Sequence, residues 1–471
     1  MDRLLIAVLA LLMAAWVWLC SAHTFVSVGD EAIYLYDGWL VAQGHLPYRD
    51  FFLAHPPLRV LLSAALFAVG LPAVAGKWLA IVATGLNTAL IAGLARKASG
   101  PWAAIAAAML WMGGALSLET GAYYLGSNVA TSFMLGACLA AAHGRWAWSG
   151  AILGLGAHQA LYALLPGPVL LWWAWRQGRA LRFVAGGMTW PAGVALAWLL
   201  FGEAYGLQTV AYHLRKVAQS PKPWPIHRII GFLRADWAAV AFGLAAWLGR
   251  GASSRRLAAL AWQSLLVVCL YRSLQSYYFT LPLALLCAAG GVGAVALTRL
   301  AAHRFGGPTA RTHVAACLTF VLVWSLSALP NLHAAVARRS FQPVVDAELT
   351  QLGQQILARP PASGLLWGDT SVTPALALRT GLPIAARFVD TNDQRFDAGL
   401  TTPQTVITTV LARHRPGVLM VAHHGVYRVA PLRRHVEQHF LAQFIFQGRA
   451  MGYDVVYLLP GDANTKTRPN P

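Results

Sequence analysis

Long apolar runs recur through the first two thirds of this chain, and they constrain its fold more than any other feature. A helix needs about 20 mostly apolar residues to cross the hydrocarbon core of a bilayer. The first run, 4–22, has no convincing small-residue cleavage site after it, which predicts an uncleaved first span. About eleven spans are predicted, at 4–22, 76–95, 101–118, 128–143, 146–164, 168–176 with its flanks, 183–201, 237–249, 257–272, 277–298 and 312–330.

The composition is typical of an integral membrane protein. Only 11% of the 471 residues are charged, against about 25% in soluble proteins, and the mean hydropathy is +0.53. These values exclude a soluble enzyme, a disordered tail and a secreted disulfide scaffold. The net charge of +19 fits Arg and Lys gathered in short cytoplasmic loops, so nucleic acid is not an expected partner. The five cysteines lie in apolar stretches and are interpreted as small buried hydrophobes.

Positive charge predicts the orientation of the spans. The stretch 57–70 is short for a span and is predicted to be a juxtamembrane helix; a twelfth span there would reverse every later loop. Without it, the N-terminus is cytoplasmic and one large outer loop, 202–236, is unusually basic, which makes it a candidate functional loop. The basic clusters then predicted inside are Arg96 and Lys97; Arg145; Arg176, Arg179 and Arg182; Arg250, Arg255 and Arg256; and Arg299, Arg304 and Arg311.

The composition changes from about residue 333, where charged residues, Gln, Thr and Pro return. We therefore divide the chain into a membrane domain, 1–332, a small soluble α/β domain, 333–460, on the outer, periplasmic side, and a disordered tail, 461–471. The first outer loop covers about 23–75. Strands are predicted at 364–369, 384–390, 417–423, 441–447 and 453–460, with helices near 342–358, 403–413 and 428–440.

Carboxylates are concentrated in the first outer loop. Residues 1–332 contain eight, of which Asp30, Glu31, Asp37 and Asp50 fall within 21 residues. If 30–42 is helical, Asp30, Tyr34 and Asp37 share one face. A partly desolvated carboxylate can act as a general base toward a hydroxyl group. Acids at a helix start also suit the helix dipole, so capping alone remains open as the alternative.

The acidic segment resembles the GT-C-type integral-membrane glycosyltransferases, above all the protein O-mannosyltransferases and the lipid A aminoarabinose transferases. The order of spans, long first outer loop and C-terminal outer domain is similar across most of the chain. The resemblance implies a mainly α polytopic fold of GT-C architecture. The matching motifs are Asp30-Glu31, Gly44-His45-Leu46-Pro47-Tyr48-Arg49-Asp50 and His55-Pro56-Pro57-Leu58.

The activity that the resemblance implies is the inverting transfer of a monosaccharide from a polyprenyl-phosphate carrier. The acceptor is an envelope lipid, glycan or protein at the outer face of a bacterial inner membrane. Asp30 matches the catalytic acid that deprotonates the acceptor, and Glu31 matches its acidic neighbour. The expected substrate-binding residues are Asp37, Tyr48, Asp50, His55, Glu119, His213, Arg215 and Arg272.

The donor phosphate requires cationic partners, for which Arg59 and Lys77 are further candidates beside His213, Arg215 and Arg272. Snorkelling to lipid head groups is the alternative for each of these cations. The aminoarabinose transferases carry Lys where this chain has His55, which argues against that sugar.

No cofactor is expected. The Asp-x-Asp metal motif of oligosaccharyltransferases is absent from the sequence, so a divalent metal is possible but not favoured. His423-His424 has no third ligand at a useful spacing and is interpreted as a strand-end loop. The C-terminal domain has no phosphate-binding glycine motif, which favours acceptor binding or partner docking there.

Two other classes of protein stay open. A transporter or lipid flippase would show repeated halves and ionisable residues at mid-membrane depth, and neither is visible in the sequence. A non-catalytic assembly subunit could retain the scaffold, although the intact Asp30-Glu31 pair argues against it. The spacing of Gly150 and Gly154 predicts close helix packing.

Overall fold

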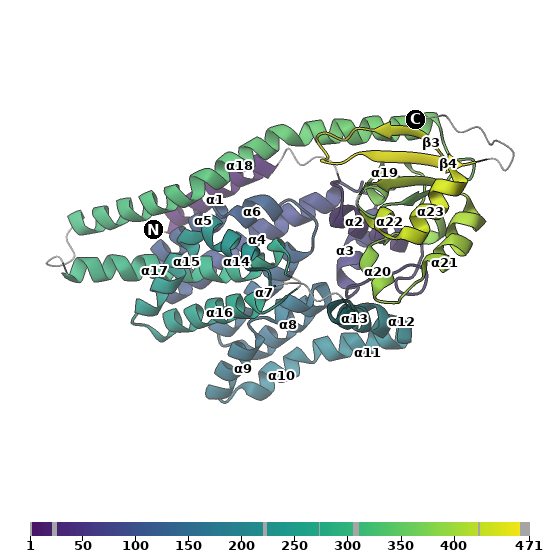
Figure 1. Ribbon diagram of the computed structural model, residues 1–471. Helices are drawn as coiled ribbons and strands as arrows, with labels where there is room; N and C mark the ends of the chain where they lie inside the picture. The colour runs from purple at the N-terminus through teal and green to yellow at the C-terminus, as the bar shows by residue number, and fades with distance from the viewer. Residues whose placement is uncertain are drawn as a thin grey trace. The chain divides into compact units, whose positions relative to one another are not determined.

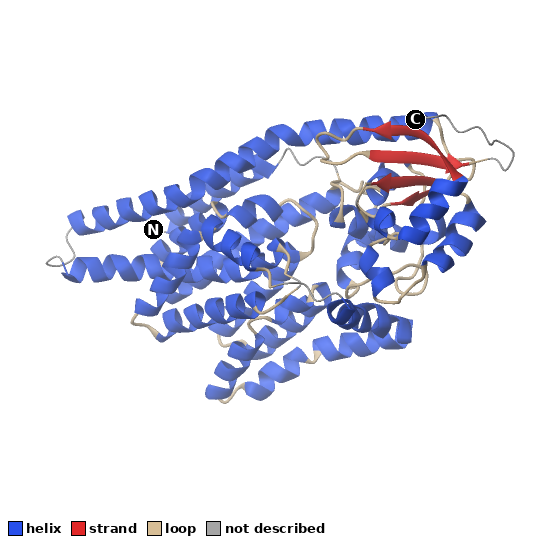
Figure 2. Cartoon of the chain, viewed as in Figure 1, coloured by secondary structure: helices blue, strands red, loops and turns tan. Residues whose placement is uncertain are grey.

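The computed structural model describes residues 2–20, 26–219, 224–272, 274–304, 310–422 and 424–461. Lys222, His423 and the tail from residue 462 lie outside the described residues. The chain is mainly helical with one small sheet (Figure 2). It divides into two compact units, which we name the helical unit and the mixed unit. The helical unit comprises Met1–Thr24, Gly76–Leu199 and Lys222–Arg339, and the mixed unit comprises Phe25–Ala75, Leu200–Pro221 and Ser340–Pro471.

The predicted spans fall mainly in helices of the helical unit. Its α-helices are labelled in Figure 1. Its elements are α1 (Asp2–Cys20), α4 (Ala75–Ser99), α5 (Pro101–Met112), α6 (Ala115–Thr120), α7 (Ser127–Ala142), α8 (Trp146–Gln159), η1 (Leu161–Leu164), α9 (Gly167–Arg176), α10 (Ala180–Gly187), α11 (Thr189–Phe201), α14 (Ile226–Ala235), α15 (Trp237–Ala245), η3 (Ala246–Leu248), α16 (Ala252–Cys269), η4 (Ser276–Phe279), α17 (Thr280–Arg304) and the first part of α18 (Ala310–Ala358).

Several of these helices have the length and hydropathy of membrane spans. Within the described residues there are four, at Ala75–Ser99, Ala180–Phe201, Ser276–Arg304 and His313–Ala358. The pair α14 and α15–η3 is bent by 79° and would make a fifth as one broken span. Others, such as α5 and α7, are apolar but shorter. Crossing of a membrane is thus supported by these helices, and the count of about eleven spans stays a prediction.

The core of the helical unit is built around α17, which is buried along most of its length and packs against α5, α15 and α16. Glycines allow this close approach. A side chain at Gly291 would collide with the carbonyl oxygen of Ala103 on α5, and one at Gly293 would collide with that of Phe242 on α15. Small residues at contacts of this kind let helix backbones meet where lipid offers no hydrophobic driving force.

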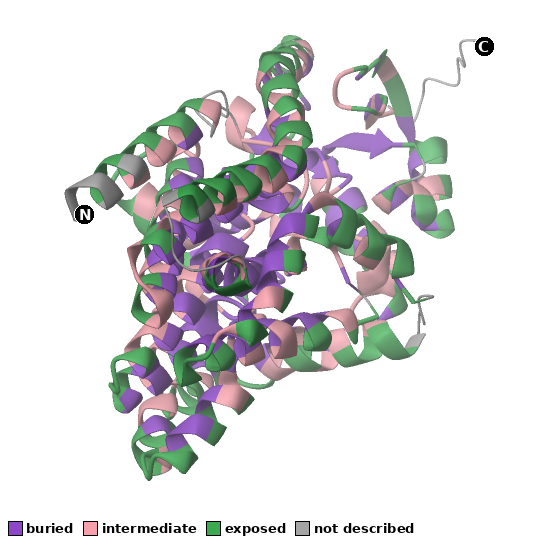
Figure 3. Ribbon diagram, turned by 90° about the vertical axis from the view of Figure 1, so that its left-hand side faces the viewer, coloured by how far each residue is buried: buried purple, intermediate pink, exposed green. Residues whose placement is uncertain are grey.

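The packing predicted for Gly150 and Gly154 is confirmed. A side chain at Gly150 on α8 would collide with the carbonyl oxygen of Phe183 on α10, and one at Gly154 would collide with Thr189 on α11. The outer faces of the helices carry the exposed residues (Figure 3). Leu199 on α11, 82% exposed, is one of many large apolar side chains on this surface, which suits a lipid environment.

The mixed unit joins segments from three parts of the chain. Its elements are α2 (Asp30–Ala42), α3 (Leu58–Ala68), α12 (Glu203–Gly206), the π-helix η2 (Leu207–Ala211), α13 (Tyr212–Gln219), the last part of α18, β1 (Leu366–Gly368), α19 (Thr373–Thr380), η5 (Ala385–Arg387), α20 (Asp393–Asp397), α21 (Pro403–Val406), the π-helix η6 (Ile407–Ala412), β2 (Gly417–Val421), α22 (Gly425–Arg428), α23 (Ala430–His439), β3 (Phe440–Phe446) and β4 (Val455–Pro460).

The sheet has the order β1-β2-β4-β3, with β1 and β2 parallel and the other pairs antiparallel. Four of the five predicted strands form. The prediction of a strand at 384–390 is wrong, because Ala386 and Arg387 have φ values of 50° and 54° and turn the backbone out of the extended region. Only an isolated bridge from Ile384 to Leu366 remains there.

The boundary predicted near residue 332 falls inside a helix. α18 runs without a break from Ala310 to Ala358 and so includes both the last predicted span and the predicted helix 342–358. The juxtamembrane helix predicted at 57–70 is α3, Leu58–Ala68. It belongs to the same unit as the C-terminal segment, so the first outer loop and the predicted soluble domain form one body.

Candidate active site

The predicted catalytic helix, α2, begins at Asp30 directly after a left-handed turn. Gly29 has a φ of 85°, a conformation that glycine adopts at no steric cost. Glu31 is buried, and its carboxylate accepts the backbone N–H of Ser27 at 2.8 Å. Glu31 therefore stabilises the turn that precedes the helix, and its predicted catalytic role stays a prediction.

Two cations, Arg59 and Lys216, act electrostatically on Asp30. Its side chain is accessible at the surface, but enough protein surrounds it that desolvation raises the pKa of its carboxyl group, while the charges of Arg59 and Lys216 lower that pKa. The two cations come from α3 and α13, so three separate segments of the mixed unit converge on Asp30. A carboxylate in this setting can accept a proton, and neighbouring cations can hold an anionic leaving group.

Arg59 and Tyr34 form the next layer around Asp30. Arg59 is only 2% exposed, and its guanidinium carbon lies 4.3 Å from the centroid of the Tyr34 ring. The Tyr34 hydroxyl is hydrogen-bonded to Nε2 of His55 at 3.0 Å. Tyr34 is one helical turn after Asp30 on α2, so the structure uses the shared helix face that the spacing predicts.

The basic loop contributes His213 and Lys216 from α13. Nε2 of His213 lies 2.8 Å from the carbonyl oxygen of Ala54 and must be its donor, and the rings of His213 and His55 have centroids 5.7 Å apart. Burial lowers the pKa of both imidazoles, which keeps them neutral at neutral pH. Lys216, three residues after His213, lies on the same helix face, whereas the predicted Arg215 is exposed.

A second charged cluster surrounds Asp37, which is 2% exposed. Its Oδ1 has no hydrogen-bond partner within the described part of the chain. Desolvation raises the pKa of Asp37 well above its ordinary value; the charge of Asp390 raises that pKa further and Arg395 opposes the shift. The charge of Asp30 in turn raises the pKa of Asp390, after desolvation as the larger cause. The clusters around Asp30 and Asp37 are therefore electrostatically linked.

Asp390 and Arg395 were not predicted. Both belong to the segment before and within α20, more than 330 residues from Asp30 in the sequence. Arg395 donates to the carbonyl oxygen of Asp390 at 2.9 Å, and its guanidinium carbon lies 4.4 Å from the ring centroid of Phe52 and 4.1 Å from that of Phe388. Desolvation lowers the pKa of Arg395 to about 10. The sequence gives no local signal for this contact, because the pairing is long-range.

Tyr48 and Asp50 fasten the first outer loop. Tyr48 has a φ of 66°, its hydroxyl donates to the carbonyl oxygen of His55 at 2.7 Å, and its own carbonyl oxygen accepts from Gln208 at 2.8 Å. Asp50 accepts the backbone N–H of Leu46 at 2.8 Å. Its hydrogen bond to Arg49 is the main reason that its pKa falls to about 2. These contacts shape the loop, and the predicted substrate contacts of both residues stay predictions.

The C-terminal segment fixes the position of α2 within the mixed unit. The backbone N–H of Gly29 donates to the carbonyl oxygen of Ser371 at 2.7 Å. Further along the helix, the hydroxyl of Tyr36 accepts the backbone N–H of Ile384 at 2.7 Å. The catalytic candidate Asp30 thus stands at the start of a helix that is held at two points by the region predicted as a soluble domain.

Glu119, Arg272 and Lys77 belong to the helical unit. Glu119 is exposed near the end of α6, and Arg272 is exposed with its guanidinium carbon 5.8 Å from the ring centroid of Trp224. Lys77 is fully buried at the start of α4, with Nζ 4.6 Å from the ring centroid of Tyr123. The other eight predicted site residues, and Arg59, all lie in the mixed unit.

A metal site is not evident in the described ranges, where no three His, Cys, Asp or Glu side chains gather as ligands. Metal independence stays a prediction. The cluster itself offers one carboxylate with a raised pKa, two cations that act on it, two neutral imidazoles and a phenol.

No protein-family model and no curated protein matches this sequence. Solved structures do match. ArnT from Cupriavidus metallidurans bound to undecaprenyl phosphate is similar at a TM-score of 0.62 and 16% identity, with 97% of each chain covered. The apo state of the same protein is similar at a TM-score of 0.63 and 14% identity, with 95% of this chain and 97% of that chain covered. Arabinofuranosyltransferase AftD from Mycobacteria is similar at a TM-score of 0.52 and 14% identity, with 96% of this chain and 40% of that chain covered.

These structures share the GT-C glycosyltransferase fold, and this chain has that fold. The resemblance seen in the sequence is thereby confirmed at the level of the fold. The likeness to ArnT extends over nearly the whole of both chains, so it includes the C-terminal segment as well as the helices.

Proposed function

We propose that this chain is a membrane glycosyltransferase that moves a monosaccharide from a polyprenyl-phosphate carrier to an envelope acceptor, with inversion at the anomeric carbon. One observation carries the proposal: in a chain with the GT-C fold, desolvation raises the pKa of Asp30 while the charges of two cations, Arg59 and Lys216, act on it. The lipid donor is supported by the ArnT structure, which is bound to undecaprenyl phosphate. The proposed location is a bacterial inner membrane, with the mixed unit on the periplasmic side.

In the proposed reaction Asp30 accepts the proton of the acceptor hydroxyl. The hydroxyl oxygen attacks the anomeric carbon from the side opposite the phosphate, the new glycosidic bond forms, and the bond from that carbon to the phosphate oxygen breaks. The electron pair leaves with the polyprenyl phosphate, whose charge Arg59 and Lys216 stabilise. Water, nucleotide and redox cofactor are not consumed.

The second cluster is the proposed acceptor side. Asp37, Asp390 and Arg395 offer both an anion and a cation next to the Asp30 cluster, and hydroxyl-rich acceptors bind through such groups. His55 and His213 are neutral and can accept or donate a hydrogen bond without adding charge. The identity of the sugar and of the acceptor follows from the assay below.

Asp30→Asn tests the proposal. It preserves the size of the side chain and removes the base, so we expect transfer to fall by a factor of about 10² to 10⁴. The measurement is transfer by the purified protein in lipid, with a panel of polyprenyl-phosphate sugars and extracted envelope acceptors. Asp397→Asn, at an exposed position on α20, is the matched control and is expected to retain wild-type transfer.

Two outcomes would overturn the assignment. Near-normal turnover by a folded Asp30→Asn protein would remove Asp30 from the reaction. Absence of donor binding, donor hydrolysis and transfer with every carrier, in a folded wild-type protein, would favour a transporter, a flippase or a non-catalytic subunit. Circular dichroism and the elution volume in detergent establish folding for each variant.

A further inference from the structure

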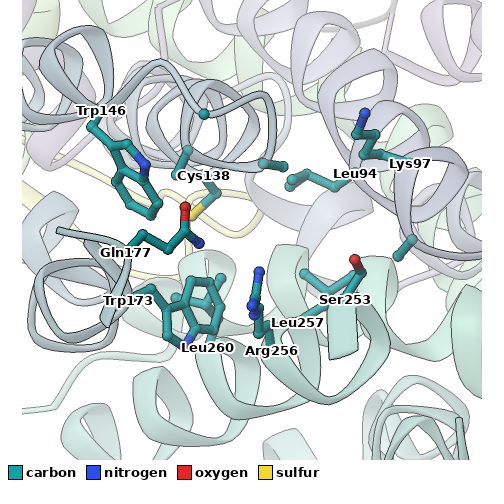
Figure 4. Close-up of a pocket in the computed structure, with 14 residues that line it drawn as sticks. Leu94, Lys97, Cys138, Trp146, Trp173, Gln177, Ser253, Arg256, Leu257 and Leu260 are labelled. Atoms are coloured by element: carbon teal, nitrogen blue, oxygen red, sulfur yellow. The ribbon is translucent and has the colours of Figure 1, made fainter. Parts of the chain in front are cut away.

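A pocket of about 200 Å³ lies inside the helical unit, where the ends of five helices meet. It is lined from the end of α4, the end of α7, the start of α8, the end of α9 and the start of α16. Figure 4 shows Gln177, directly after α9, and Arg256, on α16, reaching into this space, with Lys97 at its edge. One water occupies about 30 Å³ in the liquid, so the pocket has room for a phosphodiester group.

The charged residues that line this pocket are all positive. Lys97 and Arg256 line it, and within the described residues neither forms an ion pair. The sequence contains no Asp or Glu from 51 to 118, from 120 to 202 or from 237 to 345, and these ranges supply every lining residue. An uncompensated basic pocket attracts anions, and between membrane helices it fits the phosphate of a lipid head group.

The surroundings favour a lipid over a free anion. Trp146 and Trp173 form part of the lining, and the nearby Trp148 and Trp175 are 66% and 65% exposed. Exposed indoles concentrate at the interface between bilayer and water. The lining segments also belong to the loops that the positive charges predict to be cytoplasmic, so the pocket is expected at the lipid head groups of the inner leaflet.

We infer that this pocket binds the phosphate of an anionic phospholipid, with Lys97 and Arg256 as the charged partners and Gln177 and Ser253 as hydrogen-bonding ones. The Arg256 guanidinium carbon is 5.8 Å from the ring centroid of Trp173, another residue of the lining, and a guanidinium group offers a planar set of N–H donors that matches a phosphate. None of the lining residues takes part in the proposed transfer reaction, whose residues belong to the mixed unit.

The test is thermal unfolding of the full-length protein in a non-ionic detergent, with added phosphatidylglycerol, phosphatidylcholine or inorganic phosphate. For the wild type we expect a saturable rise of Tm with phosphatidylglycerol alone. Each cation near an anionic lipid changes affinity about fivefold, so the Lys97→Gln/Arg256→Gln variant should need roughly thirtyfold more lipid for the same rise. Arg299→Gln/Arg311→Gln removes equal charge from exposed positions outside the lining and should respond as wild type does.

Three results would overturn the inference: an equal response to phosphatidylcholine, equal loss in the pocket variant and the control, or the same rise with inorganic phosphate at matched concentration. The last would assign the site to free phosphate. If the double variant does not fold, Lys97→Gln alone changes one exposed residue and should need about fivefold more lipid. Arg256→Lys, which retains the charge, should remain close to wild type.

Discussion

The two units of this protein distribute charge in opposite ways. In the mixed unit, cations influence carboxylates: the charges of Arg59 and Lys216 act on Asp30, and that of Arg395 acts on Asp37 and Asp390. In the helical unit, the pocket at the helix ends has only cations. Neighbouring charges of both signs set the pKa of a group that can exchange a proton. A cluster of positive charges alone instead binds an anion. The difference separates a proposed reaction site from a proposed lipid site.

The charged residues of the two sites also differ in burial. Asp37 and Arg59 are each 2% exposed, whereas Lys97 and Arg256 are exposed at the pocket. Removing water from charged groups is unfavourable unless opposite charges or hydrogen bonds compensate. The mixed unit retains buried charge despite this cost, which is the usual condition of catalytic sites.

The largest effect expected after Asp30→Asn is that of Lys216→Gln. Loss of a charge-assisted contact to the leaving phosphate should reduce transfer roughly ten- to hundredfold. Because Lys216 lowers the pKa of Asp30, its removal raises that pKa, and the general base is active only above it. The rising acidic limb of the pH–rate profile should therefore move to higher pH.

The neighbouring Arg215→Gln variant is the control, because Arg215 is exposed on another face of α13. It should alter neither the rate nor the profile. The pocket variant Lys97→Gln/Arg256→Gln should also leave the profile in place, since the pocket lining includes neither Asp30 nor any other carboxylate. A shift of the profile in Arg215→Gln but not in Lys216→Gln would reverse the assignment of the two residues and restore the original prediction.

How far the sequence predicts this site depends on the range of the contacts. Asp30 was identifiable because acids are rare in the first 332 residues and cluster in one loop. Arg215 and Lys216 are adjacent, and only the rotation of α13 decides which one faces Asp30. Asp390 and Arg395 were missed because a contact across more than 330 residues leaves no periodic trace in one sequence.

The same limit applies to the fold. The apolar runs predicted where most of the helices of the helical unit lie, since hydrophobic length is a local signal. The run 384–390 also has strand composition, yet Ala386 and Arg387 adopt positive φ. Tertiary contacts decide that conformation, because the backbone of Ile384 is held by Tyr36. Residue propensity alone does not contain this information.

A smaller effect is expected for Asp37→Asn, and it concerns stability. The folded-state pKa of Asp37 is raised well above its unfolded value, so the folded protein binds the proton more tightly. Its stability therefore falls as pH rises from the unfolded pKa through the folded one. Asparagine removes the buried charge, and we expect the variant to be more stable at pH 7 by roughly 1–3 kcal/mol, with a smaller difference at pH 4.

Chemical denaturation in detergent, followed by circular dichroism at both pH values, measures this difference. Asp397→Asn should change neither value. If Asp37 also binds the acceptor, the stabilised variant should show a higher KM, an exchange of stability for function that is common at active sites. Equal stability of Asp37→Asn and wild type at both pH values would contradict the raised pKa.

The smallest expected effect is that of Tyr36→Phe, which tests whether the C-terminal segment positions α2. The variant keeps the ring and removes the oxygen that accepts the Ile384 N–H, so a buried donor loses its partner. We expect a loss of about 1–2 kcal/mol in the free energy of unfolding, measured in the same denaturation assay. Because Gly29 still donates to Ser371, α2 should keep its place and transfer should fall less than in Lys216→Gln. If transfer fell as much as in Asp30→Asn while stability stayed unchanged, Tyr36 would take part in the reaction itself. The distinction between residues that react and residues that only position α2 would then not hold for Tyr36.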